Sequence, residues 1–192
     1  EEAPEYFLEL SRERARGTVS KVRLSGNVGN EYFLAVGRED GLIDFFSVKG
    51  NLAYIATTRV DSETHEGVIM SLDWSISPAG YLASSCDRGV LCYWGALPSV
   101  LRQSSTQEIA GLEMHSWTSR VGWPVKSLAE CFDSDIEQLM AVARSKSGSL
   151  LVAADISGAL SVCHFPCLQA KSETNECMAG KSFTGHSHLP IA

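Results

Sequence analysis

The sequence predicts an all-β fold in which a short meander of strands recurs along the chain. The first observation is the stretch 67–94, where three short apolar segments are separated by turn-forming residues. The second is that the same order of segments and turns occurs before it, over 17–48, and after it, over 135–167. Such a meander is the unit of a β-propeller, in which four-stranded sheets are arranged radially as blades. We therefore expect a partial propeller of about three four-stranded blades, with the edges of neighbouring blades at its ends.

The central stretch carries the clearest strand signals. Its apolar residues alternate with less apolar ones at Val68, Met70, Leu72 and Trp74. This period of two is typical of a half-buried strand. Ser, Pro and Gly make 75–80 a predicted turn, and Asp87-Arg88-Gly89 forms a second one, since Asp accepts backbone N–H bonds and Gly tolerates positive φ. Two further strands are therefore predicted at 81–85 and 90–94.

The two flanking copies predict the same elements. Before the central stretch, strands are expected at 19–24, 32–37, 42–48 and 52–60, with a hairpin turn at Asp40-Gly41. After it, strands are expected at 136–142, 150–154 and 159–165. The copies align on three similar segments, each followed by a turn with an aspartate: Leu34–Gly37 with Asp40, Leu82–Ser85 with Asp87, and Leu151–Ala154 with Asp155.

The steps between these aspartates set the predicted domain boundaries. The first step corresponds to one blade of roughly 40–45 residues plus a loop, and the second to one blade plus an insert that contains Trp117 and Trp123. The polar segment 168–184 is expected to be a linker. The predicted parts are 1–16 (the end of a preceding blade or a linker, as strand or short helix), 17–64 (blade), 65–110 (blade), 111–134 (Trp-rich insert), 135–184 (blade with linker) and 185–192 (the start of a further blade).

Composition excludes several classes of partner. The formal net charge of −7 argues against nucleic acid or an anionic membrane as the main partner, and we expect neither. No apolar run is long enough to predict a spanning helix. The six cysteines match no zinc pattern and no small disulfide framework; Cys177 with His186 and His188 forms only a loosely metal-like group. We expect free thiols in a reducing cytoplasm, no metal and no cofactor.

Motifs in the sequence resemble those of one known family. Leu72-Asp73-Trp74-Ser75, Gly80-Tyr81-Leu82 and Tyr93-Trp94 look like the second propeller of echinoderm microtubule-associated protein-like (EMAP-like) WD-repeat proteins. Trp117–Val125 is similar to the family's insert, which ends in Gly-(Trp or Phe)-Pro-Val. The downstream matches are Asp135-Ile136, Leu150–Asp155, Phe165-Pro166-Cys167 and, as the start of another blade, Gly185-His186-Ser187. The ordered set is more specific than any single blade.

The sequence also departs from the family pattern. The spacing from Asp87 to Trp94 is one residue longer than in typical repeats. Cys163 stands where an aromatic residue usually ends the third strand of a blade. The turns between first and second strands mostly lack a Pro-Asp-Gly type sequence.

No motif of an enzyme is present in the sequence. It has no phosphate-binding glycine loop, no Gly-x-Ser-x-Gly and no His-Glu-x-x-His. His65, Ser84 and Asp87 could be drawn as a catalytic triad. The resemblance implies instead that such residues form a buried structural hydrogen-bond network. The expected members and packing partners of this network are His65, Ser84, Asp87, Trp74, Trp94, Asp40 and Asp155.

The resemblance implies a non-catalytic, microtubule-associated structural protein that binds tubulin or other cytoskeletal proteins. It implies that the chain is part of a longer one with two joined propellers, so the rest of its own propeller is another partner. The expected location is the cytoplasm and cytoskeleton, with the axoneme of a cilium or flagellum as a more specific site. The alternative is a WD-repeat scaffold for protein–protein interaction in another cytoplasmic or ciliary assembly.

Two kinds of residue are candidates for partner binding. Because tubulin and this chain are both acidic, binding requires a local basic patch. The first candidate set is Arg12, Arg14, Arg16, Lys21 and Arg23, and the second is Arg120, Lys126, Arg144 and Lys146. The tryptophans of the insert, Trp117 and Trp123, either clasp a neighbouring propeller or form an exposed aromatic contact for a partner.

Overall fold

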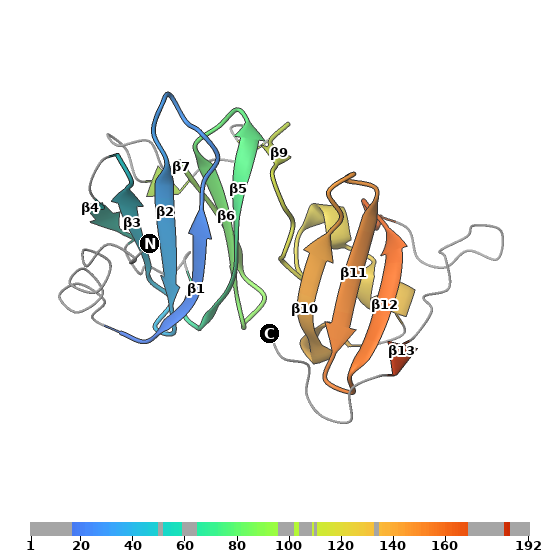
Figure 1. Ribbon diagram of the computed structural model, residues 1–192. Coiled ribbons are helices and arrows are strands. Elements are labelled where there is room, and N and C mark those ends of the chain that lie inside the picture. The colour runs from blue at the N-terminus through green and yellow to red at the C-terminus, as the bar shows by residue number, and fades with distance from the viewer. Residues whose placement is uncertain are drawn as a thin grey trace, which may run out of the picture. The chain divides into compact units, whose positions relative to one another are not determined.

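The computed structural model describes residues 17–49, 52–58, 65–95, 102–103, 109, 111–132, 135–168 and 183–184. Its described strands form three antiparallel sheets, which confirms the predicted all-β class and the partial propeller (Figure 1). The chain divides into two compact units, 1–115 and 116–192.

The first unit contains two sheets. The first sheet has the order β1-β2-β3-β4, formed by β1 (Val19–Leu24), β2 (Phe33–Arg38), β3 (Ile43–Ser47) and β4 (Ala53–Thr57). The second sheet has the order β8-β7-β6-β5-β9, formed by β5 (Ile69–Ser77), β6 (Tyr81–Cys86), β7 (Leu91–Gly95), β8 (Arg102–Gln103) and β9 (Glu113–Met114).

The second unit contains the third sheet and, among its described residues, three short helices. The sheet has the order β10-β11-β12-β13, formed by β10 (Leu139–Arg144), β11 (Leu150–Asp155), β12 (Ala159–His164) and β13 (Phe183–Thr184). The helices are η1 (Trp123–Val125), α3 (Leu128–Phe132) and η2 (Ile136–Gln138).

A four-residue turn joins the second and third strands of every sheet. Its last residue is glycine with positive φ, at 84° for Gly41, 77° for Gly89 and 81° for Gly158. Each glycine follows the leucine that begins the aligned segment (Leu34, Leu82 or Leu151) by seven residues. The three copies share this leucine-to-glycine spacing. Glycine occupies the last turn position because other L-residues are disfavoured at positive φ.

The aspartates that align the copies in the sequence are not equivalent in the structure. The glycine amide bonds the carbonyl of the first turn residue, which is Arg38, Cys86 or Asp155. Asp40 is therefore the third residue of its turn, Asp87 the second and Asp155 the first. Three aspartates at three positions cannot make the same hydrogen bonds, so the alignment on Asp was wrong in detail.

Two predicted strand ends were also wrong. β5 continues through Ser77, whereas a turn was expected from residue 75, because Ser75 and Ser77 pair with Met114 and Glu113 of β9. The third sheet starts at Leu139 and not at residue 136, because Gln138 N donates to Asp135 O at 2.9 Å and closes the 3-10 turn η2.

A bulge changes which residues of β5 enter the core. The register shifts between Ile69 and Ser71, so Ile69 is buried together with Leu72 and Trp74. Met70 is only half-buried. Residues 71–75 are all buried, so the half-buried strand predicted from the alternation of Val68, Met70, Leu72 and Trp74 was wrong in this respect.

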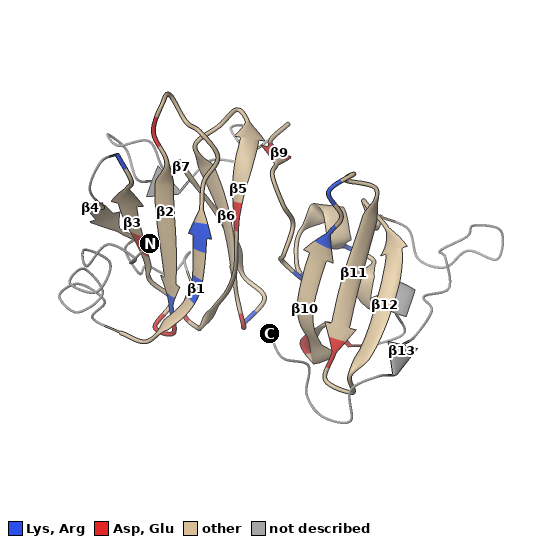
Figure 2. Cartoon of the chain, in the orientation of Figure 1, with Lys and Arg blue, Asp and Glu red and all other residues tan. Residues whose placement is uncertain are grey.

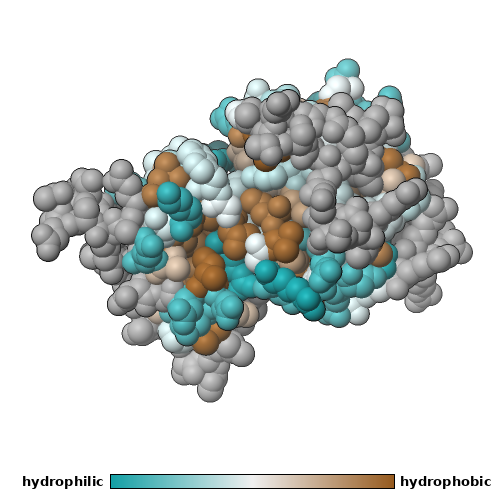
Figure 3. Space-filling view, turned by 180° about the vertical axis from the view of Figure 1, so that it is seen from behind, coloured by the Kyte–Doolittle hydropathy of each residue, from teal (hydrophilic) through white to brown (hydrophobic). Residues whose placement is uncertain are grey.

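Charged residues and exposed apolar side chains are unevenly distributed over the structure. Figure 2 shows most charged residues at turns and strand ends, while β1 carries Lys and Arg within the strand. Figure 3 shows hydrophobic residues exposed among hydrophilic ones on one face. Large hydrophobic side chains that stay exposed include Val19, Val22, Leu24, Tyr32, Ile76 and Trp123.

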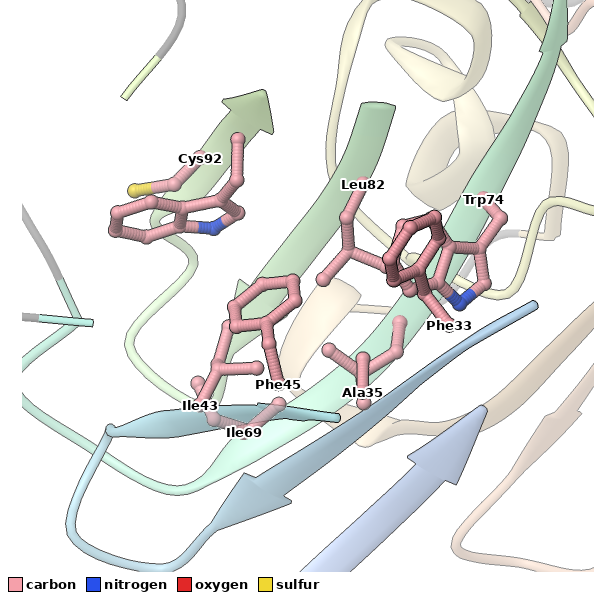
Figure 4. Packing of buried hydrophobic residues seen from close by; sticks show 10 residues of the cluster. Phe33, Ala35, Ile43, Phe45, Ile69, Trp74, Leu82 and Cys92 are labelled. Carbon is pink, nitrogen blue, oxygen red and sulfur yellow. The ribbon is translucent and has the colours of Figure 1, made fainter. Parts of the chain in front are cut away.

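The core of the first unit lies between the first and second sheets (Figure 4). Its buried residues are Phe33, Ala35, Ile43 and Phe45 from the first sheet, and Ile69, Leu72, Trp74, Leu82, Cys92 and Trp94 from the second. The Trp74 ring lies 6.5 Å from that of Phe33 and 6.2 Å from that of Phe45, between centroids. Aromatic pairs at this separation add to the free energy gained by burial.

Side chains also tie β1 to β5. Ser20 Oγ donates to Ile69 O at 2.8 Å, and Arg23 Nε donates to Leu72 O at 3.1 Å. In the opposite direction, Trp74 Nε1 donates to Arg23 O at 3.0 Å. These bonds fix the register between the first strands of two successive sheets.

Residues 116–134 of the insert belong to the second unit, whereas β9 belongs to the first. Arg144 N at the end of β10 donates to Trp117 O at 3.1 Å. Cys167 N, just after β12, donates to Pro124 O at 2.7 Å, and Cys167 O accepts from Ser127 N at 3.1 Å. Val125 and Leu128 are buried. The insert is therefore hydrogen-bonded to the end of β10 and to the segment just after β12, which lie at the same end of the sheet.

Candidate functional site

The second sheet has a buried polar corner at His65, Ser84 and Trp94. His65 Nε2 lies 2.6 Å from Ser84 Oγ, and Trp94 Nε1 donates to the same hydroxyl at 2.7 Å. All three residues are buried, and burial lowers the pKa of His65 to about 4. Ser84 Oγ therefore has two hydrogen-bond partners and is shielded from solvent.

Asp87, the third expected member, does not orient the histidine ring. His65 Nδ1 has no hydrogen-bond partner among the described residues. Asp87 lies beside Gly67 instead. A Cβ added to Gly67 would lie 2.0 Å from Asp87 Oδ1. The residue before Gly89 is Arg88, which is exposed and forms an ion pair with Glu66 at 3.3 Å. The extra residue between Asp87 and Trp94 explains this displacement.

The first sheet uses an ion-pair cluster at the equivalent corner. Arg38 and Asp44 occupy the places of Cys86 and Cys92 and are both buried. Arg38 Nη1 lies 3.5 Å from Asp44 Oδ2, and Arg38 Nη2 pairs with Asp40. Burial acts to lower the pKa of Arg38, but the hydrogen bond and charge of Asp40, and those of Asp44, outweigh it and raise the pKa.

A hydroxyl relay on the outer strands extends this cluster. Thr57 Oγ1 donates to Asp44 Oδ1, and Tyr54 OH lies 2.8 Å from Thr57 Oγ1. Asp40 was expected from the sequence, whereas Arg38 and Asp44 were not. The signal that could have found them is a pair of opposite charges in adjacent apolar strands.

In the third sheet, the side chain of Asp155 accepts hydrogen bonds within the β11–β12 turn. Asp155 Oδ1 accepts hydrogen bonds from Ser157 Oγ at 2.6 Å, Ser157 N at 2.8 Å and Ala159 N at 3.0 Å. Burial acts to raise the pKa of Asp155, but these hydrogen bonds outweigh it and lower the pKa. Asp40, Asp87 and Asp155 thus belong to three separate arrangements, and Trp74 packs in the core and not at the corner.

The first set of candidate partner-binding residues is only partly described. Arg12, Arg14 and Arg16 lie outside the described residues. Lys21 and Arg23 lie in β1, and the guanidinium of Arg23 is engaged with Leu72 O. Arg23 therefore contributes to the packing of two sheets. Lys21 is the other cation of this strand, and it is half-buried.

The second set and the two tryptophans lie in the second unit. Trp117 is only 2% exposed, its Nε1 donates to Ser119 O, and its ring packs on Phe165, so it is not the exposed contact considered in the sequence analysis. Trp123 is 69% exposed. Arg120 Nη1 donates to Leu139 O at 3.0 Å, which holds the insert to the start of β10.

The described residues hold no group of three His, Cys, Asp or Glu side chains arranged for a metal ion. Cys177, His186 and His188 lie outside the described residues. Cys86, Cys92, Cys163 and Cys167 are buried free thiols. No helix in the described part of the chain is both long and apolar enough to cross a membrane.

These sheets define the class of protein: the chain is a segment of a WD-repeat β-propeller. Its fold is similar to the β-propeller domain of Myceliophteria thermophila Cps50 (Swd1), with a TM-score of 0.50 and 17% identity, over 90% of this chain and 59% of that one. That likeness shows the fold alone. No protein-family model matches the chain.

The resemblance to EMAP-like proteins is confirmed by sequence comparison. The chain is 28% identical over 156 residues to echinoderm microtubule-associated protein-like 2 from Homo sapiens, which covers 81% of this chain. It is 28% identical over 159 residues to the 77 kDa echinoderm microtubule-associated protein from Lytechinus variegatus, which covers 82% of this chain. Each alignment covers only 22% of the relative, so the chain spans about a fifth of their length.

Proposed function

We propose that the chain is part of a non-catalytic, microtubule-associated scaffold that binds tubulin through its propeller. The observation that carries this proposal is the similarity to two proteins named as microtubule-associated, over four-fifths of the chain. Propellers hold loops on a rigid framework, and such loops commonly form binding surfaces. The proposed location follows from the partner: the cytoplasm and cytoskeleton, including the axoneme of a cilium or flagellum.

A non-catalytic role agrees with the chemistry of the buried corners. A general base must reach the proton that it removes and have a pKa near the working pH. His65 is fully buried, with a pKa lowered to about 4. Hydrolysis by this protein that is lost on His65→Ala would contradict the proposal.

Microtubule co-sedimentation tests the proposed function directly. The full-length protein that carries this chain is incubated with polymerised tubulin at low salt and centrifuged. We expect it to pellet with microtubules and to be released as salt rises, because contacts between exposed charges are screened. A protein that stays in the supernatant at low salt would contradict tubulin binding and favour a scaffold role in another assembly.

A further inference from the structure

The two ends of the third sheet carry opposite charges. β10 ends at Arg144, and the β10–β11 hairpin that follows contains Lys146. At the opposite end, Asp155 pairs with Leu139, and Asp135 and Glu137 precede β10. Figure 2 shows blue segments at the hairpin end of this sheet and red segments at the other. A chain with a net charge of −7 therefore has a locally basic surface here.

Backbone contacts bring the insert to the basic end. β12 ends beside the start of β11, and Phe165 N donates to Ser149 O of the hairpin at 2.9 Å. Two residues further on, Cys167 bonds Pro124 and Ser127. These contacts place η1, with Trp123, and the exposed Lys126 that follows it at the hairpin end of the sheet.

The backbone of Trp123 is anchored although its ring is exposed. Pro124 follows it at the start of η1, and Trp123 O accepts from Lys126 N. The neighbouring Val125 and Leu128 are buried. Because this backbone is already ordered, covering the ring costs less conformational entropy than covering one on an unstructured segment, and Trp is enriched at the energetic centres of interfaces.

We propose that Trp123, Lys126 and Lys146, here called the Trp123 surface, bind an acidic peptide segment of a protein partner. The Trp123 ring covers an apolar side chain of the peptide, and the two ammonium groups contact its carboxylates. Arg144 at the end of β10 adds positive charge to this end of the sheet, and its guanidinium lies 5.1 Å from the centre of the Phe165 ring. The proposal rests on the proposed function, because tubulin tails are acidic segments of this kind.

Charge complementarity selects this occupant over others. Lys126 and Lys146 are exposed, and the acids of the sheet lie at its far end. Arg120 belongs to that far end and is bonded to Leu139 O, so it is not part of the surface. Glu130 on α3 is the nearest acid in sequence to Lys126 and opposes binding modestly.

A peptide-binding assay on the full-length protein tests the surface. The probe is a fluorescein-labelled synthetic peptide of glutamates around one central phenylalanine, and binding is followed by fluorescence anisotropy. We expect Trp123→Ala to weaken binding about tenfold. Lys126→Gln with Lys146→Gln should weaken it about tenfold and flatten its salt dependence.

Matched controls separate this surface from net charge and general apolar exposure. Lys49→Gln with Arg88→Gln removes the same number of exposed charges in the first unit, and Tyr32→Ala removes an exposed ring there. Both should bind the peptide as the wild type does. Equal loss in the controls, or unchanged binding in the Trp123 and lysine variants, would overturn the proposal.

Pelleting with microtubules distinguishes this inference from the proposed function. If the wild type pellets and the Trp123 surface variants pellet equally well, tubulin binding holds and the surface is wrong. If the wild type binds the peptide through this surface but does not pellet, the surface holds and its partner is another acidic protein. Circular dichroism of each variant checks that the fold is unchanged.

Discussion

Burial has a strong electrostatic effect on His65. Its side chain is fully buried, Nε2 contacts Ser84, and burial lowers its pKa to about 4. The imidazole is therefore neutral at pH 7. It links the segment that precedes β5 to Ser84 of β6. Protonating it would place a charge in the core without a carboxylate bonded to Nδ1.

The stability of the first unit should therefore fall in mild acid. An unfolded histidine titrates near pH 6.5, whereas His65 in the folded chain titrates near 4. Between these values the unfolded state binds more protons, so this stabilisation is present above pH 6.5 and is lost as the pH falls through 4. The loss amounts to at most about 3 kcal/mol.

Urea unfolding at a series of pH values measures this dependence. His65→Gln, which keeps a polar group near Ser84, should reduce the slope between pH 7 and pH 4.5. His164→Gln alters an exposed histidine and should leave the slope as in the wild type. An unchanged slope in His65→Gln would show that other groups cause the acid sensitivity.

At the scale of elements, the same meander is fastened in three different ways. The second sheet uses a neutral histidine, serine and tryptophan, the first a buried arginine between two aspartates, and the third a turn capped by its own aspartate. What the copies share is the backbone, with glycine at the fourth turn position. The corner chemistry is thus replaceable, which is the expected behaviour of a structural site.

Close approach between β2 and β5 limits what the first sheet tolerates. A Cβ added at Gly37 would lie 2.5 Å from Ile69 Cγ2 and 2.8 Å from Ile69 Cβ. Because Ile69 is a stiff β-branched residue in the core, Gly37→Ala should lower the free energy of unfolding by about 1–3 kcal/mol. Urea titration of the variant measures the change.

Gly26→Ala is the matched control, since nothing lies within 4 Å of the added Cβ. Its free energy of unfolding should stay within about 0.5 kcal/mol of the wild type. Equal destabilisation by the two substitutions would mean that glycine itself, and not the contact with Ile69, is responsible.

Strand positions follow from the sequence, whereas side-chain environments depend on packing. The alternation around Leu72 and Trp74 and the turn glycines are local signals, and they identify the sheets. The extension of β5 to Ser77 depends on a strand that arrives from the insert, so no local pattern predicts it. Trp117 and Trp123 occur in one short segment, but Trp117 is buried and packs on Phe165, whereas Trp123 is exposed.

The corner of the first sheet shows the same limit. Charged residues within strands usually face water, so the burial of Arg38 and Asp44 is signalled in the sequence only by their opposite charges in adjacent apolar strands. His65, Ser84 and Trp94 were expected from the resemblance, but the loss of an Asp87 bond to His65 Nδ1 depends on turn position. A shift of one residue in a four-residue turn redirects the side chain entirely.

At the scale of the whole molecule, each compact unit has a core of its own. The first unit buries aromatic and aliphatic residues between two sheets. The second buries Trp117, Val125 and Leu128 of the insert, together with Leu151 of β11. Cores that are separate in this way allow local unfolding of one unit without the other.

Hydrogen exchange measured by mass spectrometry tests this independence. Gly37→Ala should speed amide exchange in β1–β7 and leave β10–β12 unchanged, because the clash with Ile69 acts on the first core. Leu151→Ala should do the reverse, since deleting a buried leucine costs about 2–5 kcal/mol within the second core. The two variants control for each other. If either one speeds exchange in both units, the units unfold together, and a partner bound at the Trp123 surface would then stabilise the first core as well as the second.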